Sequence, residues 1–255
     1  LKPSGPADPR ALIRRLYSDL TGLPPTAEQV AAFVNNPTDA AYRKVVDNLL
    51  GSPHYGERWG RHWLDLARFG ESDGFERNGV RNNLWPYRDW IINALNDDIP
   101  YDEFVRMQVA GDVLKPGDPA GQRAVGFLVA GLHKTVVGGS EFMKKTARQD
   151  EMEEIVGTVG QTFVGLTVNC ARCHNHKFDP FTQRHYYNLQ TIFAAVDRAE
   201  RVYDADPGIQ QQRTALNAQL ASLRQQRTEL EATIQAAGGG EFEKLQKQQV
   251  ELLKR

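Results

Sequence analysis

Apolar residues along this chain recur at the three- and four-residue spacing of amphipathic helices, and alternating strand patterns are almost absent. Thr26 and Gln29 have the spacing of a capping box, Pro86 suits the first position of a helix, and residues 115–120 are expected to form a loop. The apolar stripes occupy residues 12–20, 30–34, 45–50, 59–67, 90–95, 152–163 and 186–196. The pattern predicts an all-α fold, an irregular multi-helix domain with long connecting loops.

The pattern changes after Asp204, where isoleucine and leucine recur in a near-heptad repeat among Gln, Arg and Glu. Glycines at residues 238–240 interrupt this repeat, which predicts a C-terminal helical hairpin or coiled-coil arm. Arg213 and Arg227 lie on the apolar seam and favour antiparallel packing over a long dimeric zipper. We therefore expect a helical domain over residues 1–203 and an arm over residues 204–255, with spacing or oligomerisation as the use of the arm. The apolar positions of the repeat are Ile209, Leu216, Leu220, Leu223, Leu230, Ile234, Phe242, Leu245, Leu252 and Leu253.

Composition excludes several classes of protein. With Lys+Arg 31 against Asp+Glu 32, the net charge of −1 lacks the positive surface of a nucleic-acid-binding protein. The longest apolar run, residues 124–132, is about half of the roughly 20 residues that a transmembrane helix needs. Two cysteines three positions apart exclude a disulfide scaffold. We expect residues 1–4 to be a start within a longer or processed protein, so the lack of a leader pattern there is not evidence against export.

The two cysteines lie in the sequence Cys-Ala-Arg-Cys-His over residues 170–174, which matches the attachment pattern of c-type haem. Thiols at Cys170 and Cys173 lie about one helical turn apart, so they can add to both vinyl groups of one porphyrin. His174 then lies beneath the ring, where its imidazole can bind the iron. The sequence therefore predicts one covalently attached haem c.

Three other interpretations of the cysteines stay open. Cys170, Cys173, His176 and His185 could form a zinc knuckle, although structural zinc sites more often combine two separated pairs of ligands. A thioredoxin-type redox pair would need a βαβ context, and the cysteines could also be structural thiols. For structural thiols, packing gives no reason for a histidine directly after the second cysteine.

The residues around the motif resemble the signature of a planctomycete family, the cytochrome c-associated (PSCyt-type) domain of unknown function. That domain commonly follows an ordinary cytochrome c domain in large exported proteins. The resemblance spans roughly residues 10 to 200 and implies an extracytoplasmic haem protein without supplying a reaction. Met107, Asn169 and His185 depart from the family pattern, so it assigns them no role. The matching segments are GLTVNCARCHNHKFDP (165–180), DLTGLPP (19–25), SPHYGER (52–58), HWLDLAR (62–68), YRDW (87–90) and AGD (110–112).

The sixth ligand of the iron would decide how the haem behaves. His62 is the first candidate, because it shares a helical face with Trp59, Trp63 and Leu66 and is expected to point into the apolar interior. The alternative is a core histidine bonded to a backbone carbonyl. Further candidates are His133, in a glycine-rich loop, and Met107, Met143 and Met152, which are more typical of core filling.

One residue within the motif and one just after it are expected to contact the cofactor. His176 is too close to His174 to reach the opposite face of the iron, and we expect it to contact a propionate or to support the iron ligand. Arg172 is a candidate polar group near the haem.

Acidic residues after the fourth predicted helix suggest a bound Ca²⁺ ion, because hard oxygen ligands on a flexible loop suit this cation. The pattern is not a complete EF-hand loop, and a solvated acidic turn is the alternative. An ion close to the haem would raise its potential. The candidate ligands are Glu71, Asp73, Glu76 and Asn78, with Asp65 and Asp179 from other segments.

These observations predict a monohaem electron-transfer module outside the cytoplasm, with redox proteins or adjoining cytochrome domains as partners. The alternatives are a haem enzyme with an open distal site, with Arg172, His62 or Asp65 as polar groups, and a zinc-binding helical scaffold. Carbon monoxide binding, peroxidase activity and metal analysis distinguish the three.

Overall fold

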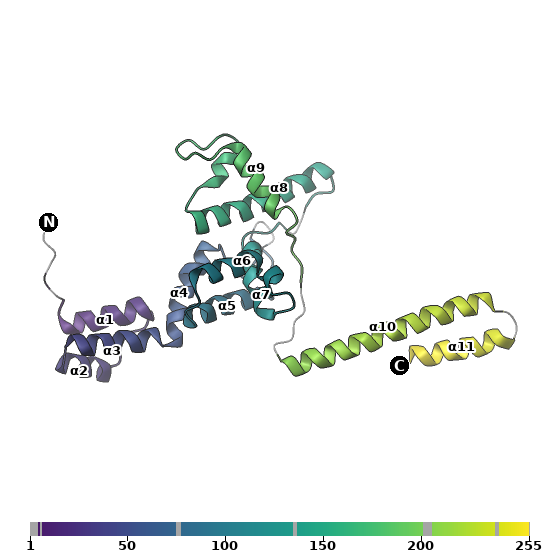
Figure 1. Ribbon diagram of the computed structural model, residues 1–255, viewed down its shortest axis with the longest axis horizontal. Helices are drawn as coiled ribbons and strands as arrows, with labels where there is room; N and C mark the ends of the chain where they lie inside the picture. Colours follow the sequence, from purple (N-terminus) through teal and green to yellow (C-terminus); the bar gives the residue numbers. More distant parts are fainter. Residues whose placement is uncertain are drawn as a thin grey trace. The chain divides into compact units, whose positions relative to one another are not determined.

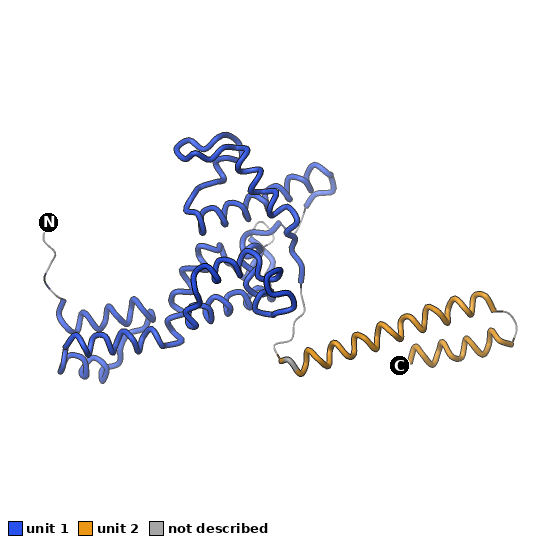
Figure 2. The backbone as a smooth tube through the Cα atoms, in the orientation of Figure 1, with its two compact units in different colours: residues 1–200 blue, residues 201–255 orange. Residues whose placement is uncertain are grey.

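The computed structural model describes residue 5 and residues 7–74, 78–134, 137–200, 206–237 and 240–254. The chain divides into two compact units, residues 1–200 and residues 201–255 (Figure 2). Within the described residues every regular element is helical, and the only strand-like pairing is an isolated bridge between Ser72 and Val80. The all-α prediction is confirmed.

Three short helices open the first unit: α1 (Pro9–Leu20), α2 (Ala27–Asn35) and α3 (Asp39–Leu50) (Figure 1). The predicted capping box is present at α2, where the Thr26 hydroxyl accepts from the Gln29 amide and the Gln29 side chain accepts from the Thr26 amide. Because such caps satisfy amides that have no partner inside the helix, they fix where each helix begins.

The middle of the first unit contains α4 (Pro53–Leu66), α5 (Trp85–Asn96), α6 (Tyr101–Leu114) and α7 (Pro119–Ala124), followed by a 3-10 helix over Val125–Val129. Helices α4 and α5 approach closely at Gly56, whose amide donates to Asn96 Oδ1 over 2.8 Å. A Cβ atom on Gly56 would lie 2.6 Å from that same oxygen, so only glycine allows this contact.

The sequence pattern did not predict α6, and residues predicted as a loop are helical from Pro119. The buried face of α6 contains Gln108 and Gly111 beside Phe104 and Met107, so its apolar stripe is broken. Gln108 is fully buried. Its amide can be buried at low cost because its Oε1 accepts from Trp63 Nε1 over 2.7 Å and from the Tyr87 hydroxyl over 2.8 Å. A buried amide with satisfied hydrogen bonds thus occupies a place where the pattern expects an apolar residue.

The last part of the first unit consists of α8 (Glu141–Val159), a π-helix (Gly160–Val164), a 3-10 turn (Val168–Arg172) and α9 (Gln183–Phe193). Val156 of α8 and Tyr186 of α9 are fully buried in a core shared with α5 and α6. The cysteine motif lies in the turn between these two helices.

The second unit contains α10 (Pro207–Ala236) and α11 (Gly240–Leu253), which contact each other as a helical hairpin (Figure 1). Gln249 Nε2 donates to Glu231 Oε1 across the two helices over 3.3 Å. Over the described ranges of both units, no helix has the length and apolar character to cross a membrane.

Candidate functional site

The 3-10 turn Val168–Arg172 contains Cys170 and is followed directly by Cys173, and both cysteines face solvent. Cys170 and Cys173 are exposed free thiols, while Val168 and Ala171 are buried beneath them. The turn therefore packs its small apolar side chains against the core and leaves the two sulfur atoms accessible.

Two glycines allow this turn to approach the preceding helix. A Cβ atom on Gly160 would lie 2.5 Å from Val168 Cγ2, and one on Gly157 would overlap the side-chain amide of Asn169. The π-helix that follows α8 ends at Gly165, whose φ of 70° lies in the left-handed region that favours glycine. These glycines turn the chain back so that the motif lies against α8.

Arg172 attaches the turn to both neighbouring helices. Its guanidinium pairs with Glu153 and, over 3.5 Å, with Asp150, both on α8. Its carbonyl oxygen accepts from Gln183 Nε2 over 3.0 Å and from the Tyr187 hydroxyl over 3.1 Å, both on α9. Sequence reasoning missed Gln183 and Tyr187, for which the only signal is their four-residue spacing on one face of α9.

One ring nitrogen of His174 is hydrogen-bonded to the backbone, and the other is available to bind a metal. Its Nδ1 lies 2.8 Å from the carbonyl oxygen of Asn175, and since a carbonyl only accepts, Nδ1 bears the proton in the neutral ring. Nε2 then has a free lone pair, and the residue is exposed. The amide of Gln183 donates to Asn175 Oδ1 over 2.9 Å, which holds Asn175 in place. The ring therefore presents a metal-binding nitrogen next to the two thiols.

His176 has the opposite arrangement, with both ring nitrogens bonded within the protein. Its side chain is only 8% exposed, its Nδ1 accepts from the Asp179 amide over 2.9 Å, and its Nε2 lies 3.1 Å from Thr167 Oγ1. Its own amide donates to the Phe181 carbonyl over 2.8 Å. His176 thus connects the loop after the motif to Thr167, which directly precedes the 3-10 turn. No nitrogen is left for the predicted contact with a propionate.

Tyr186 is fully buried on α9, and its hydroxyl has no hydrogen-bond partner among the residues that the structure describes. Burial raises the pKa of this phenol above its usual value, while the nearby positive charge of Arg172 opposes the shift. The side chain therefore stays neutral and forms part of the apolar floor below the motif.

Comparison with protein families identifies the first unit. The family model PSCyt2, described as a protein of unknown function (DUF1549), matches residues 1–198. The chain belongs to this family. The predicted resemblance to a PSCyt-type domain is confirmed. No curated protein and no solved structure matches the chain.

In this PSCyt2 domain His62 does not point into the interior, and that prediction is wrong. The residue is exposed on α4, its ring centroid 5.5 Å from that of Trp59, with Trp59 41% and Leu66 52% exposed. The buried residues of α4 are instead Gly56 and Gly60, which face α5, and the partly buried Trp63 beside them donates to Gln108 of α6. Small residues, rather than the aromatic stripe, thus determine which side of the helix faces the core.

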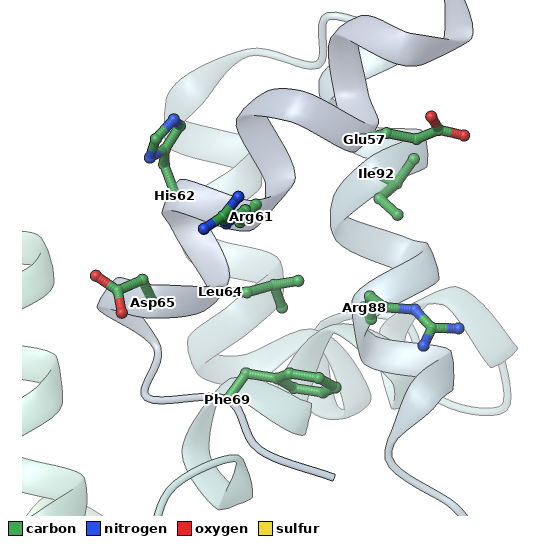
Figure 3. Close-up of a pocket in the computed structure, with 8 residues that line it drawn as sticks. All are labelled: Glu57, Arg61, His62, Leu64, Asp65, Phe69, Arg88 and Ile92. Carbon is green, nitrogen blue, oxygen red and sulfur yellow. The ribbon is translucent and has the colours of Figure 1, made fainter. Parts of the chain in front are cut away.

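His62 lies at the edge of a groove of about 580 Å³ between α4 and α5 (Figure 3). Leu64, Phe69 and Ile92 provide its apolar surface, and none of its lining residues belongs to the motif turn. The other lining residues are Glu57, Arg61, Asp65 and Arg88.

Two of the three methionines proposed as axial ligands lie in the core, and His133 is bonded to a carboxylate. Met107 and Met152 are 4% and 3% exposed within the core, whereas Met143 is 48% exposed. His133 Nδ1 lies 2.6 Å from Glu151 Oε1, and Glu151 also pairs with Arg148 over 3.2 Å. The buried methionines fill the core, and His133 is already paired with a carboxylate.

The predicted calcium ligands are not gathered at one place. Glu71 Oε1 pairs with Arg88 over 2.8 Å, Asp73 lies 3.6 Å from Arg81, and Asp179 lies 3.2 Å from His176. Asp65 is exposed at the groove in Figure 3, and Glu76 lies outside the described residues. Among the residues that the structure describes, no three His, Cys, Asp or Glu side chains form a metal-binding group.

The predicted zinc knuckle is not formed by these described residues either. His176 is occupied on both nitrogens, and His185 Nδ1 accepts from the Thr182 amide over 3.3 Å as part of the cap of α9. Because these two histidines serve the backbone, a zinc ion at the thiols would lack two of its four expected ligands.

Proposed function

We propose that the chain is an extracytoplasmic c-type electron-transfer module with one covalently attached haem. The observation that supports it most strongly is the pairing of two exposed thiols with a histidine whose Nδ1–H is bonded to a carbonyl and whose Nε2 is open. Iron-binding histidines characteristically donate their other ring N–H to a carbonyl or carboxylate, which fixes the ring.

The donor set fits covalent attachment. Each thiol of Cys170 and Cys173 would add across one vinyl group: the sulfur bonds to one vinyl carbon and the thiol proton passes to the other. This addition needs no net oxidation or reduction. The bound iron would supply exchange of single electrons between its ferrous and ferric states.

The protein's own residues would keep this site in a fixed geometry. The two ion pairs of Arg172 and the two hydrogen bonds to its carbonyl hold the turn between α8 and α9. A fixed turn keeps the sulfurs and the imidazole in constant relation, and their exposure would let a partner approach. Redox proteins or adjoining cytochrome domains are the proposed partners.

His62 remains the proposed sixth ligand. The end of α4 contacts the segment leading into the motif, since Thr162 Oγ1 donates to the Leu66 carbonyl over 3.3 Å. Leu66 is 52% and Val164 62% exposed at these two segments, and large exposed apolar side chains are typical of surfaces that a ligand covers. His62 lies one turn before Leu66 on the same helix.

Replacement of the proximal histidine tests the proposal. We expect His174→Ala, matured in a host that attaches haem c, to keep the covalent adduct, lose the six-coordinate ferrous spectrum and bind carbon monoxide. His54→Ala is the matched control, because His54 is an exposed histidine that pairs with Glu57 on its own helix. An unchanged spectrum in His174→Ala would show that another residue binds the iron. Rapid carbon monoxide binding by the unmodified protein would instead favour an open haem site.

A further inference from the structure

The two helices of the second unit differ in length: α10 has 30 residues and α11 has 14. Leu223, Leu230 and Ile234 of α10 are half-buried against α11. Nearer the start of α10, Ile209, Leu216 and Leu220 are 51%, 63% and 46% exposed. The hairpin therefore covers only the second half of the apolar stripe on α10.

The exposed half continues the heptad register of the covered half. One heptad position holds Ile209, Leu216, Leu223 and Leu230, and the other holds Arg213, Leu220, Arg227 and Ile234. A stripe that keeps this spacing over the whole helix has the geometry needed for a second helix to pack along all of it. We call the exposed part, made by Ile209, Arg213, Leu216 and Leu220, the open seam.

Charge distinguishes the two halves of α10. Residues 207–222 contain a single charged side chain, Arg213, whereas residues 223–236 contain four: Arg224, Arg227, Glu229 and Glu231. A helix half that faced only water would typically have charged residues on its polar face. The nearly uncharged flanks of the open seam offer no charge pattern that would select an acidic or basic partner, and they do not repel an identical helix.

Arg213 determines the direction in which an identical helix can pack. In a parallel pair Arg213 would face the partner's Arg213, which places like charges on the seam. In an antiparallel pair Arg213 faces the partner's Leu216, while Ile209 faces the partner's Leu220. The aliphatic part of the arginine can then cover the leucine while its guanidinium reaches solvent.

We propose that the open seam is a homodimer interface, on which the open seam of a second copy of this chain packs in antiparallel orientation. This inference concerns the second unit alone and does not depend on haem.

Sedimentation equilibrium of the full chain tests the inference. We expect the mass to rise with concentration from 28.6 kDa towards twice that value within a range up to about 100 μM. Leu216→Gln combined with Leu220→Gln should weaken the dimer at least about a hundredfold, because it removes four leucines from the shared interface. Ala218→Gln is the matched control on the opposite face of the same helix and should leave the dimer unchanged.

Two results would overturn the proposal: a mass of 28.6 kDa throughout this concentration range, or a Leu216→Gln/Leu220→Gln variant that still dimerises. Circular dichroism verifies that the variant helix is intact. Disulfide trapping tests the orientation of the two helices. Cys170 and Cys173 are first changed to serine, so that the engineered cysteines are the only thiols in the chain. An Ile209→Cys chain mixed with a Leu220→Cys chain, both of which keep Arg213, should form the mixed disulfide, whereas Ile209→Cys linking to itself would indicate a parallel pair.

Discussion

The cysteine motif and the acidic loop after α4 both contain residue types that bind metals. They differ in whether the metal-binding atoms are already paired with other protein groups. At the motif, Arg172, Asn175 and His176 make the hydrogen bonds and ion pairs that hold the backbone, so the two thiols and His174 Nε2 stay open. In the acidic loop, Glu71 and Asp73 are themselves paired with arginines.

The comparison shows that a binding site depends on which lone pairs remain unused. A carboxylate paired with a guanidinium must lose that partner before it can bind a cation. The arginines that neutralise the loop, Arg81 and Arg88, come from outside the run of acidic residues. Neutralisation of this kind depends on the fold, since Arg88 reaches Glu71 from α5, 17 positions along the chain.

The largest effect is expected from His176→Ala, which removes the connection between Thr167 and the loop after the motif. The change removes a side chain that is only 8% exposed and leaves the part-buried amide of Asp179 without its acceptor, and we expect the first unit to lose about 2–4 kcal/mol of unfolding free energy. Chemical denaturation measures this loss, and hydrogen exchange should show faster exchange of the Asp179 amide. Lys177→Ala, at the exposed neighbouring position, should change stability by less than about 0.5 kcal/mol. Similar losses in the two variants would show that His176 does not support the motif.

A smaller effect is expected from Gly157→Ala. The added methyl group would overlap the Asn169 side chain and separate the motif turn from α8, at a cost of about 1–3 kcal/mol. Gly139→Ala is the control, because a Cβ atom there meets nothing within 4 Å. Thermal unfolding compares the two variants. Equal stability in both would mean that the turn does not pack against Gly157.

The smallest effect is expected in the acidic loop. Glu71→Gln removes a half-exposed ion pair with Arg88 and should cost less than about 1 kcal/mol. Adding Ca²⁺ to about 1 mM, where weak extracellular sites are occupied, should leave the midpoint of unfolding unchanged. A rise in this midpoint that disappears in Glu71→Gln would establish a calcium site and contradict the comparison.

The sequence was sufficient to predict most helices and the position of the motif, because both depend on local spacing. Capping at Thr26 and the heptads of α10 can be recognised within a few residues. The inward face of α4 could not be predicted this way, since its apolar residues surround much of the helix. Gly56 and Gly60 select that face because they let α5 approach.

The role of His176 was also beyond sequence reasoning. Its bonds to Thr167 and Asp179 depend on how the loop folds back, and a histidine beside a haem motif equally suits a cofactor contact. The pairing of Glu71 with Arg88 similarly joins residues that only the packing of α5 brings together.

The central claim is that Cys170 and Cys173 attach one porphyrin whose iron is bound by His174. Intact-mass spectrometry of the denatured, natively matured chain, together with its alkaline pyridine spectrum, tests the covalent attachment most directly. We predict a mass that exceeds that of the amino acids by one haem, with a c-type pyridine spectrum. A colourless chain whose mass equals that of its amino acids alone would contradict the account.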